Sequence, residues 1–557
     1  MSSRRGKYLL IGGGVVALIV AAAIAALLLF DINAFTSNIE SAAFDATGLE
    51  VRIKGKMGLS FFPFGVSAQD ISVTNKGDKI ISLESLKLGA ELMPLLKKQL
   101  KATSCELVKP IIFIVKDAEG SYNFESPEKK ATKWMLKKVV NLNEFKLSKG
   151  DFVYLDKKTG EKTVLKDFNL SVRDLSTGNT PGDIIKNASF TGSIDSREAH
   201  QKNFRIENLR ATVKAVKGIY NFEPLTIGAL DNVDRKSGEK TELKGITLTI
   251  KKLSVVNTPG ETIKNVSFTG NMDCKEVRKK DLKIDNVKSS IKAEKGAFYL
   301  KPLTMDVFGA KGEGDATLDK SETDILYKIN VKISKLDFKK LQQSLGIKQV
   351  IGGKGDLVAA MTLKEKGSRM LMSSLEGTFS LRGDNLVIYI MDLDKVLSKY
   401  ETSQEFNLVD LGAFFIAGPL STFAVRGYRA GDLYNQTRGG NGAITHFNSH
   451  WKIKHGVADA TDCALATHHN RVALKGRLDL VNERYDNVIV ALLDDKGCAK
   501  FKQSISGPFR KPQISALSAA ESVAGPFSHL YTRAKRFIQG GKCEVIYKGS
   551  VQQPPDE

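Results

Sequence analysis

Apolar and polar residues alternate with a period of two along most of the chain. In residues 327–333, for example, the apolar positions are Tyr327, Ile329, Val331 and Ile333, and the positions between them are polar. Neighbouring side chains of a strand point to opposite faces, so this pattern is typical of strands with one buried and one exposed face. Many such strands in succession predict a mainly β protein built on a long antiparallel sheet.

Residues 8–30 break this pattern, because they form an apolar run without a charge. A helix needs ~20 apolar residues to cross a bilayer, and the basic residues in 4–7 would hold the N-terminus in the cytoplasm. A cleaved signal peptide is the alternative, but its apolar region usually spans only ~7–15 residues and ends in small residues. The run ends instead in the bulky Leu29 and Phe30. The sequence therefore predicts a single uncleaved transmembrane anchor.

Helical patterns are few and short. Residues 32–44 continue the helical pattern after the apolar run, and residues 336–345 form a second helical stretch that Gly346 ends. Residues 392–400 form a third. Residues 516–539 form a fourth, which Gly525-Pro526 interrupts.

An internal repeat organises the middle of the chain. Residues 165–225 align without gaps with residues 243–303, at an offset of 78 (243 − 165). Two copies fall short of the ~3 that a repeat array needs, so we interpret the repeat as a duplicated β-meander. It predicts that Phe190 and Phe268 occupy equivalent inward positions, as do Leu170 and Leu248.

The composition describes a folded globular protein, with 42% hydrophobic and 26% charged residues. At ~100–200 residues per domain, two to four domains are expected. The net charge of +21 suggests attraction to anionic lipid head groups. Alternatively, lysines on exposed strand faces serve to prevent edge-to-edge aggregation. No nucleic-acid-binding motif is present, so we expect no nucleic acid partner.

The residues that usually carry chemistry form no convincing site. His468 and His469 are adjacent, and neighbours on a strand point apart, which disfavours a shared metal. The glycine-rich stretches 309–314 and 352–355 lack the strand–loop–helix context of a phosphate loop, so we interpret them as turns. We therefore expect no enzyme activity, no cofactor and no metal. The chain has five cysteines, and Cys498 with Cys543 is the disulfide that we predict.

A long sheet with one apolar face must cover that face or leave it for a ligand. Next to a membrane, the natural ligand of an apolar trough is an acyl chain. The residues that we predict to line such a trough are Leu170, Phe190, Leu248, Phe268, Tyr327, Ile329, Val331 and Ile333.

Several short motifs follow one another in a recognisable order. They include Phe30–Asn33, Thr47-Gly48, Phe62-Pro63, Pro94–Leu96, Gly120–Phe124, Lys301–Leu303 with Phe308-Gly309, the segments 336–355 and 384–396, and Ile505–Gly507 before Pro512. This order resembles the AsmA family of envelope proteins over nearly the whole chain. Phe308-Gly309-Ala310 departs from the family's usual strand turn.

The resemblance implies a curved antiparallel sheet that forms a groove (a β-taco). It also implies the following segments: a cytoplasmic N-terminus (1–7), the anchor (8–30), an N-terminal β module (31–130), the duplicated meander (131–310), a C-terminal β module (311–515) and a C-terminal helix and tail (516–557). If ~25 strands stack at ~4.8 Å, the groove is about 120 Å long.

The resemblance further implies an inner-membrane protein of a Gram-negative envelope, with most of the chain in the periplasm. The groove would hold or conduct phospholipid acyl chains toward the outer membrane, with an outer-membrane or periplasmic protein as a further partner. The family supplies no catalytic residues. The alternative function is an assembly or scaffolding factor for outer-membrane proteins, in which a sheet edge docks client strands. The sequence does not decide between the two.

Overall fold

The computed structural model describes residues 36–61, 64–91, 102–124, 143–176, 188–233, 238–255, 266–344, 346, 349, 351–366, 369–389, 392–395, 415, 440–515, 518–519 and 545–554. The predicted anchor at 8–30 lies outside these residues. None of the helices formed by the described residues is long and apolar enough to span a membrane.

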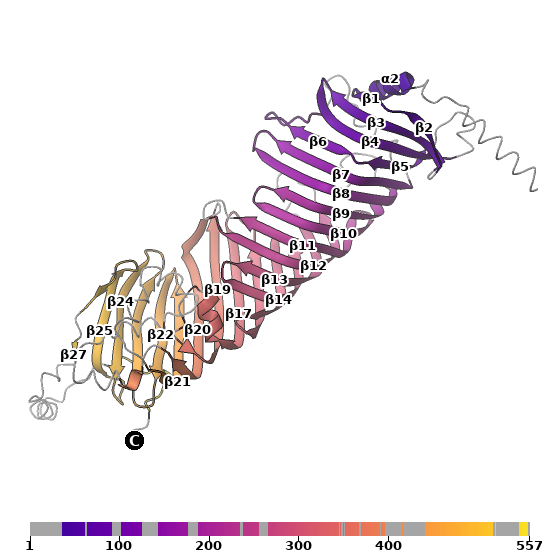
Figure 1. The fold of residues 1–557 in the computed structure, drawn as a ribbon. Helices are drawn as coiled ribbons and strands as arrows, with labels where there is room; N and C mark the ends of the chain where they lie inside the picture. The colour runs from indigo at the N-terminus through magenta and orange to yellow at the C-terminus, as the bar shows by residue number, and fades with distance from the viewer. Residues whose placement is uncertain are drawn as a thin grey trace, which may run out of the picture. The chain divides into compact units, whose positions relative to one another are not determined.

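The described residues are mainly β, as predicted, with only short helices (Figure 1). The chain divides into two compact units. Unit 1 comprises Met1–Gly238 and Lys244–Val256, and unit 2 comprises Glu239–Leu243 and Asn257–Glu557. Strand β12 (Lys240–Val255) contributes residues to both units. The division falls inside the segment 131–310 that the sequence groups together.

Unit 1 begins with helix α2 (Thr36–Thr47). Its strands are β1 (Glu50–Ile53), β2 (Met57–Phe61), β3 (Phe64–Asn75), β4 (Asp78–Ala90), β5 (Ala102–Val108), β6 (Ile111–Lys116), β7 (Glu144–Asp156), β8 (Glu161–Ser176), β9 (Ser189–Gln201), β10 (Phe204–Val216) and β11 (Ile219–Val233). Both β1 and β2 pair with β3, and β4 pairs with β5 and β6. From β7 to β11, each strand pairs antiparallel with the next.

The prediction of a purely antiparallel sheet is wrong in unit 1, because β5 and β6 both run parallel to β7. A parallel pair needs a long crossover connection in place of a tight turn, and residues 117–143 separate β6 from β7. Half-buried strands show the same period of two in both arrangements. The alternation of residues therefore could not reveal the parallel pairs, and the sheet is mixed.

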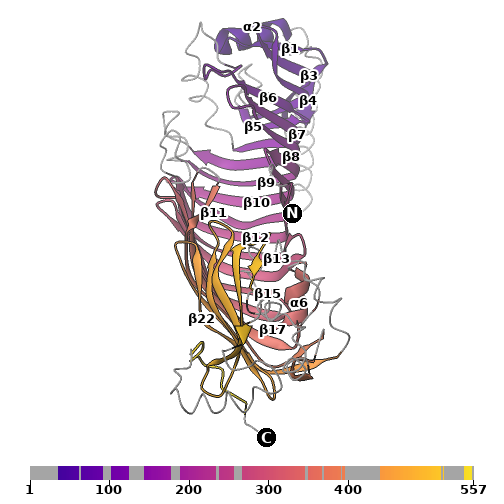
Figure 2. The same ribbon diagram turned by 90° about the vertical axis from the view of Figure 1, so that its left-hand side faces the viewer.

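Unit 2 continues with β13 (Val266–Lys279), β14 (Leu282–Glu294), β15 (Ala297–Val307), β16 (Ala310–Asp319), β17 (Ile325–Asp337), α6 (Phe338–Ser344), β18 (Ile351–Gly352), β19 (Lys354–Lys366), β20 (Arg369–Ile388), β21 (Gly442–Lys454), β22 (Val457–Ala466), β23 (Arg471–Asp479), β24 (Arg484–Leu493), β25 (Ala499–Pro508), β26 (Gln513–Ile514) and β27 (Ser518–Ala519). Successive long strands pair antiparallel, with β17 next to β19. Figure 2 shows these strands from the side, with α6 beside β17.

The structure confirms some of the predicted helices in whole or in part and contradicts one. Helix α6 (Phe338–Ser344) confirms the pattern at 336–345, and α2 overlaps the pattern at 32–44. Of the pattern at 392–400, residues 393–395 are helical. The prediction of a helix from residue 516 is wrong at Ser518–Ala519, where the backbone pairs with Phe501 and Lys502 of β25. Pairing with a sheet edge overrides local helix propensity there, and residues 520–539 lie outside the described residues.

The two copies of the repeat form equivalent contacts. Phe190 pairs with Ala215, which pairs with Tyr220; 78 residues later, Phe268 pairs with Ala293, which pairs with Phe298. The ring centroids lie 6.2 Å apart in the first copy and 6.4 Å apart in the second. The same offset relates two ion pairs, Glu161–Lys202 and Glu239–Lys280. Phe190 and Phe268 are therefore equivalent, as predicted.

Five strands carry a β-bulge built around a left-handed residue. At each bulge one strand has an extra residue relative to its partner, and one bulge residue has φ between 47° and 58°. These residues are Lys149, Asp167, Asp174, Asn286, Lys335 and Asn487. Such bulges bend a strand and increase its twist.

Side chains on neighbouring strands bind the amides of three of these bulges. The Lys149 amide donates to Asn169 Oδ1 at 2.8 Å, and the Asp167 amide donates to Asp151 Oδ1 at 2.9 Å. The Lys335 amide likewise donates to Asp356 Oδ1 at 2.8 Å. A polar side chain thus supplies the acceptor that the interrupted ladder does not.

We predict that Lys335→Val destabilises unit 2 by about 1 kcal/mol or more, because β-branched residues avoid positive φ. Lys335→Gly is the matched control and should stay near the parent stability, because glycine adopts this conformation freely. Urea unfolding followed by the fluorescence of Trp451 measures both variants. Equal losses in the two variants would show that the lysine side chain matters and the backbone conformation does not.

Candidate functional site

The strand registers of unit 2 place a continuous set of apolar side chains on one face of the sheet. One row of direct cross-strand partners is Phe268, Ala293, Phe298, Leu318, Tyr327 and Leu363. The adjacent row is Gly270, Ile291, Leu300, Ala316, Ile329 and Met361. The opposite face is mainly polar: between these rows lie Lys292, Thr317 and Lys328, together with the exposed Tyr299. The sheet is thus amphipathic, with its two sides chemically distinct.

The apolar face is partly open to solvent over β13–β17. Phe268, Phe298, Leu318 and Tyr327 are only half-buried, and the side chain of Ile329 is 42% exposed. We call this region, formed by the two rows above together with Val331, the open apolar face. An exposed apolar surface of this extent usually marks a binding site.

The structure separates the predicted trough residues. Tyr327, Ile329 and Val331 lie on the open apolar face with Phe268, whereas Ile333 is buried. In unit 1, Leu170 pairs with the buried Leu147 and with Ile194. Ile194 follows Gly192 by two residues and Phe190 by four, so these three positions lie on the same face of their strand. Leu248 is half-buried in β12. Each unit therefore carries part of the predicted set.

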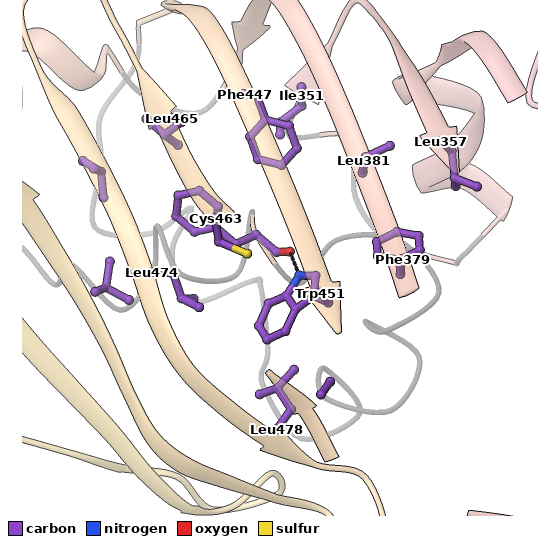
Figure 3. Close-up of a cluster of buried hydrophobic side chains, with 14 of the residues drawn as sticks. Ile351, Leu357, Phe379, Leu381, Phe447, Trp451, Cys463, Leu465, Leu474 and Leu478 are labelled. Atoms are coloured by element: carbon purple, nitrogen blue, oxygen red, sulfur yellow. Dashed lines mark hydrogen bonds between the residues drawn. The ribbon is translucent and has the colours of Figure 1, made fainter. Parts of the chain in front are cut away.

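Beyond β19 the same face becomes a closed core. Figure 3 shows Phe379 and Leu381 of β20, Phe447 and Trp451 of β21, Cys463 and Leu465 of β22, and Leu474 and Leu478 of β23 in one cluster. All of these residues are at most 2% exposed. Burial in this cluster raises the pKa of the Cys463 thiol to about 12, so the thiol stays protonated at neutral pH.

Phe415 covers this closed core. Its ring stacks on Phe447, with centroids 5.9 Å apart. Its carbonyl accepts hydrogen bonds from Trp451 Nε1 at 3.2 Å and from the Ser449 hydroxyl. The buried indole N–H and hydroxyl thereby find a partner, which a buried polar group needs.

Helix α6 covers the core beside β17 and β18. Phe338 packs edge-on against Phe447, with centroids 6.3 Å apart, and Leu341 is buried beside it. Gln342 fixes the helix to β18, because its amide group donates to the Ile351 carbonyl at 2.7 Å and accepts from the Ile351 amide at 3.1 Å. The open apolar face is therefore bounded on two sides, by α6 and by Phe415.

A polar contact marks the opposite edge of the open apolar face. The Tyr327 hydroxyl donates to Glu365 Oε2 at 2.5 Å. Burial, and then this bond to a carboxylate, raise the pKa of Tyr327 to about 12. The tyrosine is therefore neutral at physiological pH, with an apolar ring on the face and a polar tip at its edge.

The described residues contain no group of three His, Cys, Asp or Glu side chains that could hold a metal ion. His468 and His469 lie exposed between β22 and β23. Cys498 is disulfide-bonded, and its predicted partner Cys543 lies outside the described residues. Cys105 and Cys463 are thiols that take part in no disulfide bond.

Sequence reasoning missed Phe338, Phe415 and Trp451 as boundaries of the site. The alternation of Phe447, Ser449, Trp451 and Ile453 carries a period-two signal that indicates their shared face. Nothing in that signal indicates that Phe415, distant in sequence, packs on it.

A comparison with protein-family models matches the AsmA family over residues 2–251 and 261–463. The chain belongs to the AsmA family. The match includes residues of both units, ends at residue 463 and confirms the resemblance drawn from the motifs. No curated protein and no solved structure gave a match.

We predict that Phe379→Ala costs about 3–5 kcal/mol of stability, because it leaves a cavity in a packed core. Phe298→Ala, the same change on the open apolar face, should cost less than about 1.5 kcal/mol, because that ring is only half-buried. Chemical unfolding of both variants provides the test. Equal costs would contradict the distinction between an open and a closed part of the face.

Proposed function

We propose that this AsmA-family protein is an inner-membrane-anchored periplasmic β-groove protein. It holds or conducts phospholipid acyl chains for outer-membrane lipid transport and biogenesis. The observation that carries the proposal is the open apolar face of unit 2, where the side chain of Ile329 is 42% exposed although its row is apolar on every strand from β14 to β19.

The dimensions of the open apolar face suit an acyl chain. On β17 the positions of the open apolar face run from Tyr327 to Val331, which is about 14 Å at ~3.4 Å per residue. Each methylene group that leaves water for such a surface contributes about 0.8 kcal/mol. The face offers few polar groups, so it suits a ligand that is recognised by length and apolarity and not by specific hydrogen bonds.

The membrane anchor in this proposal is the apolar run 8–30. The family match begins at residue 2 and therefore includes this run. With the N-terminus in the cytoplasm, both units would lie in the periplasm. The net charge of +21 would favour anionic phospholipid head groups near the membrane surface.

Replacing Ile329 with Asp tests the acyl-chain proposal. Because the position is open to water, the carboxylate stays hydrated, the fold should survive, and co-purifying phospholipid should fall. Thr317→Asp is the matched control, since it adds the same charge on the opposite face beside Lys328 and should leave lipid unchanged. The measurement is mass spectrometry of lipid extracted from full-length protein, with circular dichroism as the check on folding.

A folded Ile329→Asp variant with normal phospholipid and normal outer-membrane integrity would count against the groove. The scaffolding function, in which client strands dock on a sheet edge, would then be the better proposal.

The anchor has its own test. The full chain should stay with membranes after an alkaline wash, and its mature N-terminus should precede residue 8. Mature chains that begin after Phe30 would establish a cleaved signal peptide instead.

A further inference from the structure

We infer that the open apolar face of unit 2 is closed at its C-terminal side, so that an acyl chain bound there stops at β19–β20 and does not continue toward β25. The inference rests on the proposed function and adds a position: Phe415 forms the stop, together with Phe338. It favours a protein that holds its lipid in unit 2 over one that passes lipid out through the C-terminal strands.

The exposure of side chains along single cross-strand rows locates the stop. In one row, Ile329 is 42% exposed, Met361 is half-buried, and Ile453 is 2% exposed. In the next row, Val331 is half-buried, Ala359 is 6% exposed, and Phe379 is fully buried. The side chains of the face remain apolar from the exposed to the buried positions. The open part therefore ends because other groups cover the face, and not because polar residues begin there.

Specific contacts hold Phe415, the residue that covers the core at β20–β21, in its position. The Phe415 ring is fully buried against Phe447, and its carbonyl is the acceptor for both Trp451 Nε1 and the Ser449 hydroxyl. A ligand that displaced Phe415 would take the Phe415 carbonyl away from the buried Ser449 hydroxyl, which is costly, and would leave Trp451 Nε1 with Ser449 Oγ, 2.8 Å away, as its acceptor. A hydrocarbon chain has no acceptor to offer, so it cannot take over that role.

Helix α6 closes the remaining direction along the strands. On β17 the side chains pass from the exposed Ile329 to Ile333 at 4% and Leu336 at 0% exposure. Phe338 lies directly after β17 and faces Phe447. An acyl chain on the open apolar face therefore meets an aromatic wall both across the strands and along them.

Photo-crosslinking tests the position of the stop with two matched sites. A diazirine analogue of phenylalanine replaces Phe298, on the open apolar face, or Phe379, behind the stop. The full-length protein is incubated with vesicles of phosphatidylethanolamine and phosphatidylglycerol that carry radiolabelled acyl chains, and is then irradiated. We expect strong labelling from position 298 and little from position 379.

The Phe415→Ala variant provides the second arm. Removing the ring should open the core, so labelling at position 379 should rise several-fold while labelling at position 298 persists. Should this variant fail to fold, Trp451→Phe replaces it, because that change removes a donor to the Phe415 carbonyl and keeps an aromatic ring. Persistent labelling at position 298 reports that the fold is intact.

The outcomes separate the inference from the proposed function. Equal labelling at positions 298 and 379 in the parent protein would overturn the stop but leave lipid binding in place. No gain at position 379 in a folded stop variant would also overturn the role of Phe415. No labelling at either position would count against the acyl-chain function itself.

Discussion

The apolar face of the unit 2 sheet is the constraint on which the rest of the structure depends. Strands β13–β25 place apolar side chains on the same face of the sheet. The hydrophobic effect therefore favours the burial of that face. The chain meets this demand in two ways within one sheet. At β21 it supplies its own cover through Phe415 and through Phe338 of α6, whereas over β13–β17 the side chains remain partly exposed. The proposed ligand site lies where the chain's own cover ends.

The bulges allow long strands to keep this two-sided chemistry while the sheet bends. A residue with positive φ interrupts the alternation of side chains, so an uncorrected bulge would turn apolar groups outward. In β17 the exposed Lys335 is the extra residue of the bulge. Ile333 before it and Leu336 after it are therefore both buried on the apolar face. The Asp356 carboxylate accepts a hydrogen bond from the Lys335 backbone amide at the bulge. Polar residues at these positions thus keep the apolar face continuous.

Much of this architecture could be predicted from local pattern, and the parts that could not depend on distant contacts. The period of two revealed the strands and the faces of Tyr327 and Ile329, and the separate helical pattern at 336–345 gave the boundaries of α6 within two residues. It could not reveal that β5 and β6 run parallel to β7, because strand direction leaves no trace in the alternation. It could not reveal the cover over Trp451 either, since Phe415 reaches that site from the long segment between β20 and β21.

The internal repeat shows which part of the chain carries the residues that close the apolar face. The two copies share the aromatic pair Phe190–Tyr220 and Phe268–Phe298, and both pairs are half-buried on an apolar face. The second copy ends at residue 303, before Phe338 and Phe415. The repeated element therefore carries the open type of surface and holds no residue of the stop. Under the proposed function each copy carries apolar surface of its own for an acyl chain, while the segment that follows the second copy, present once, holds the residues of the proposed stop.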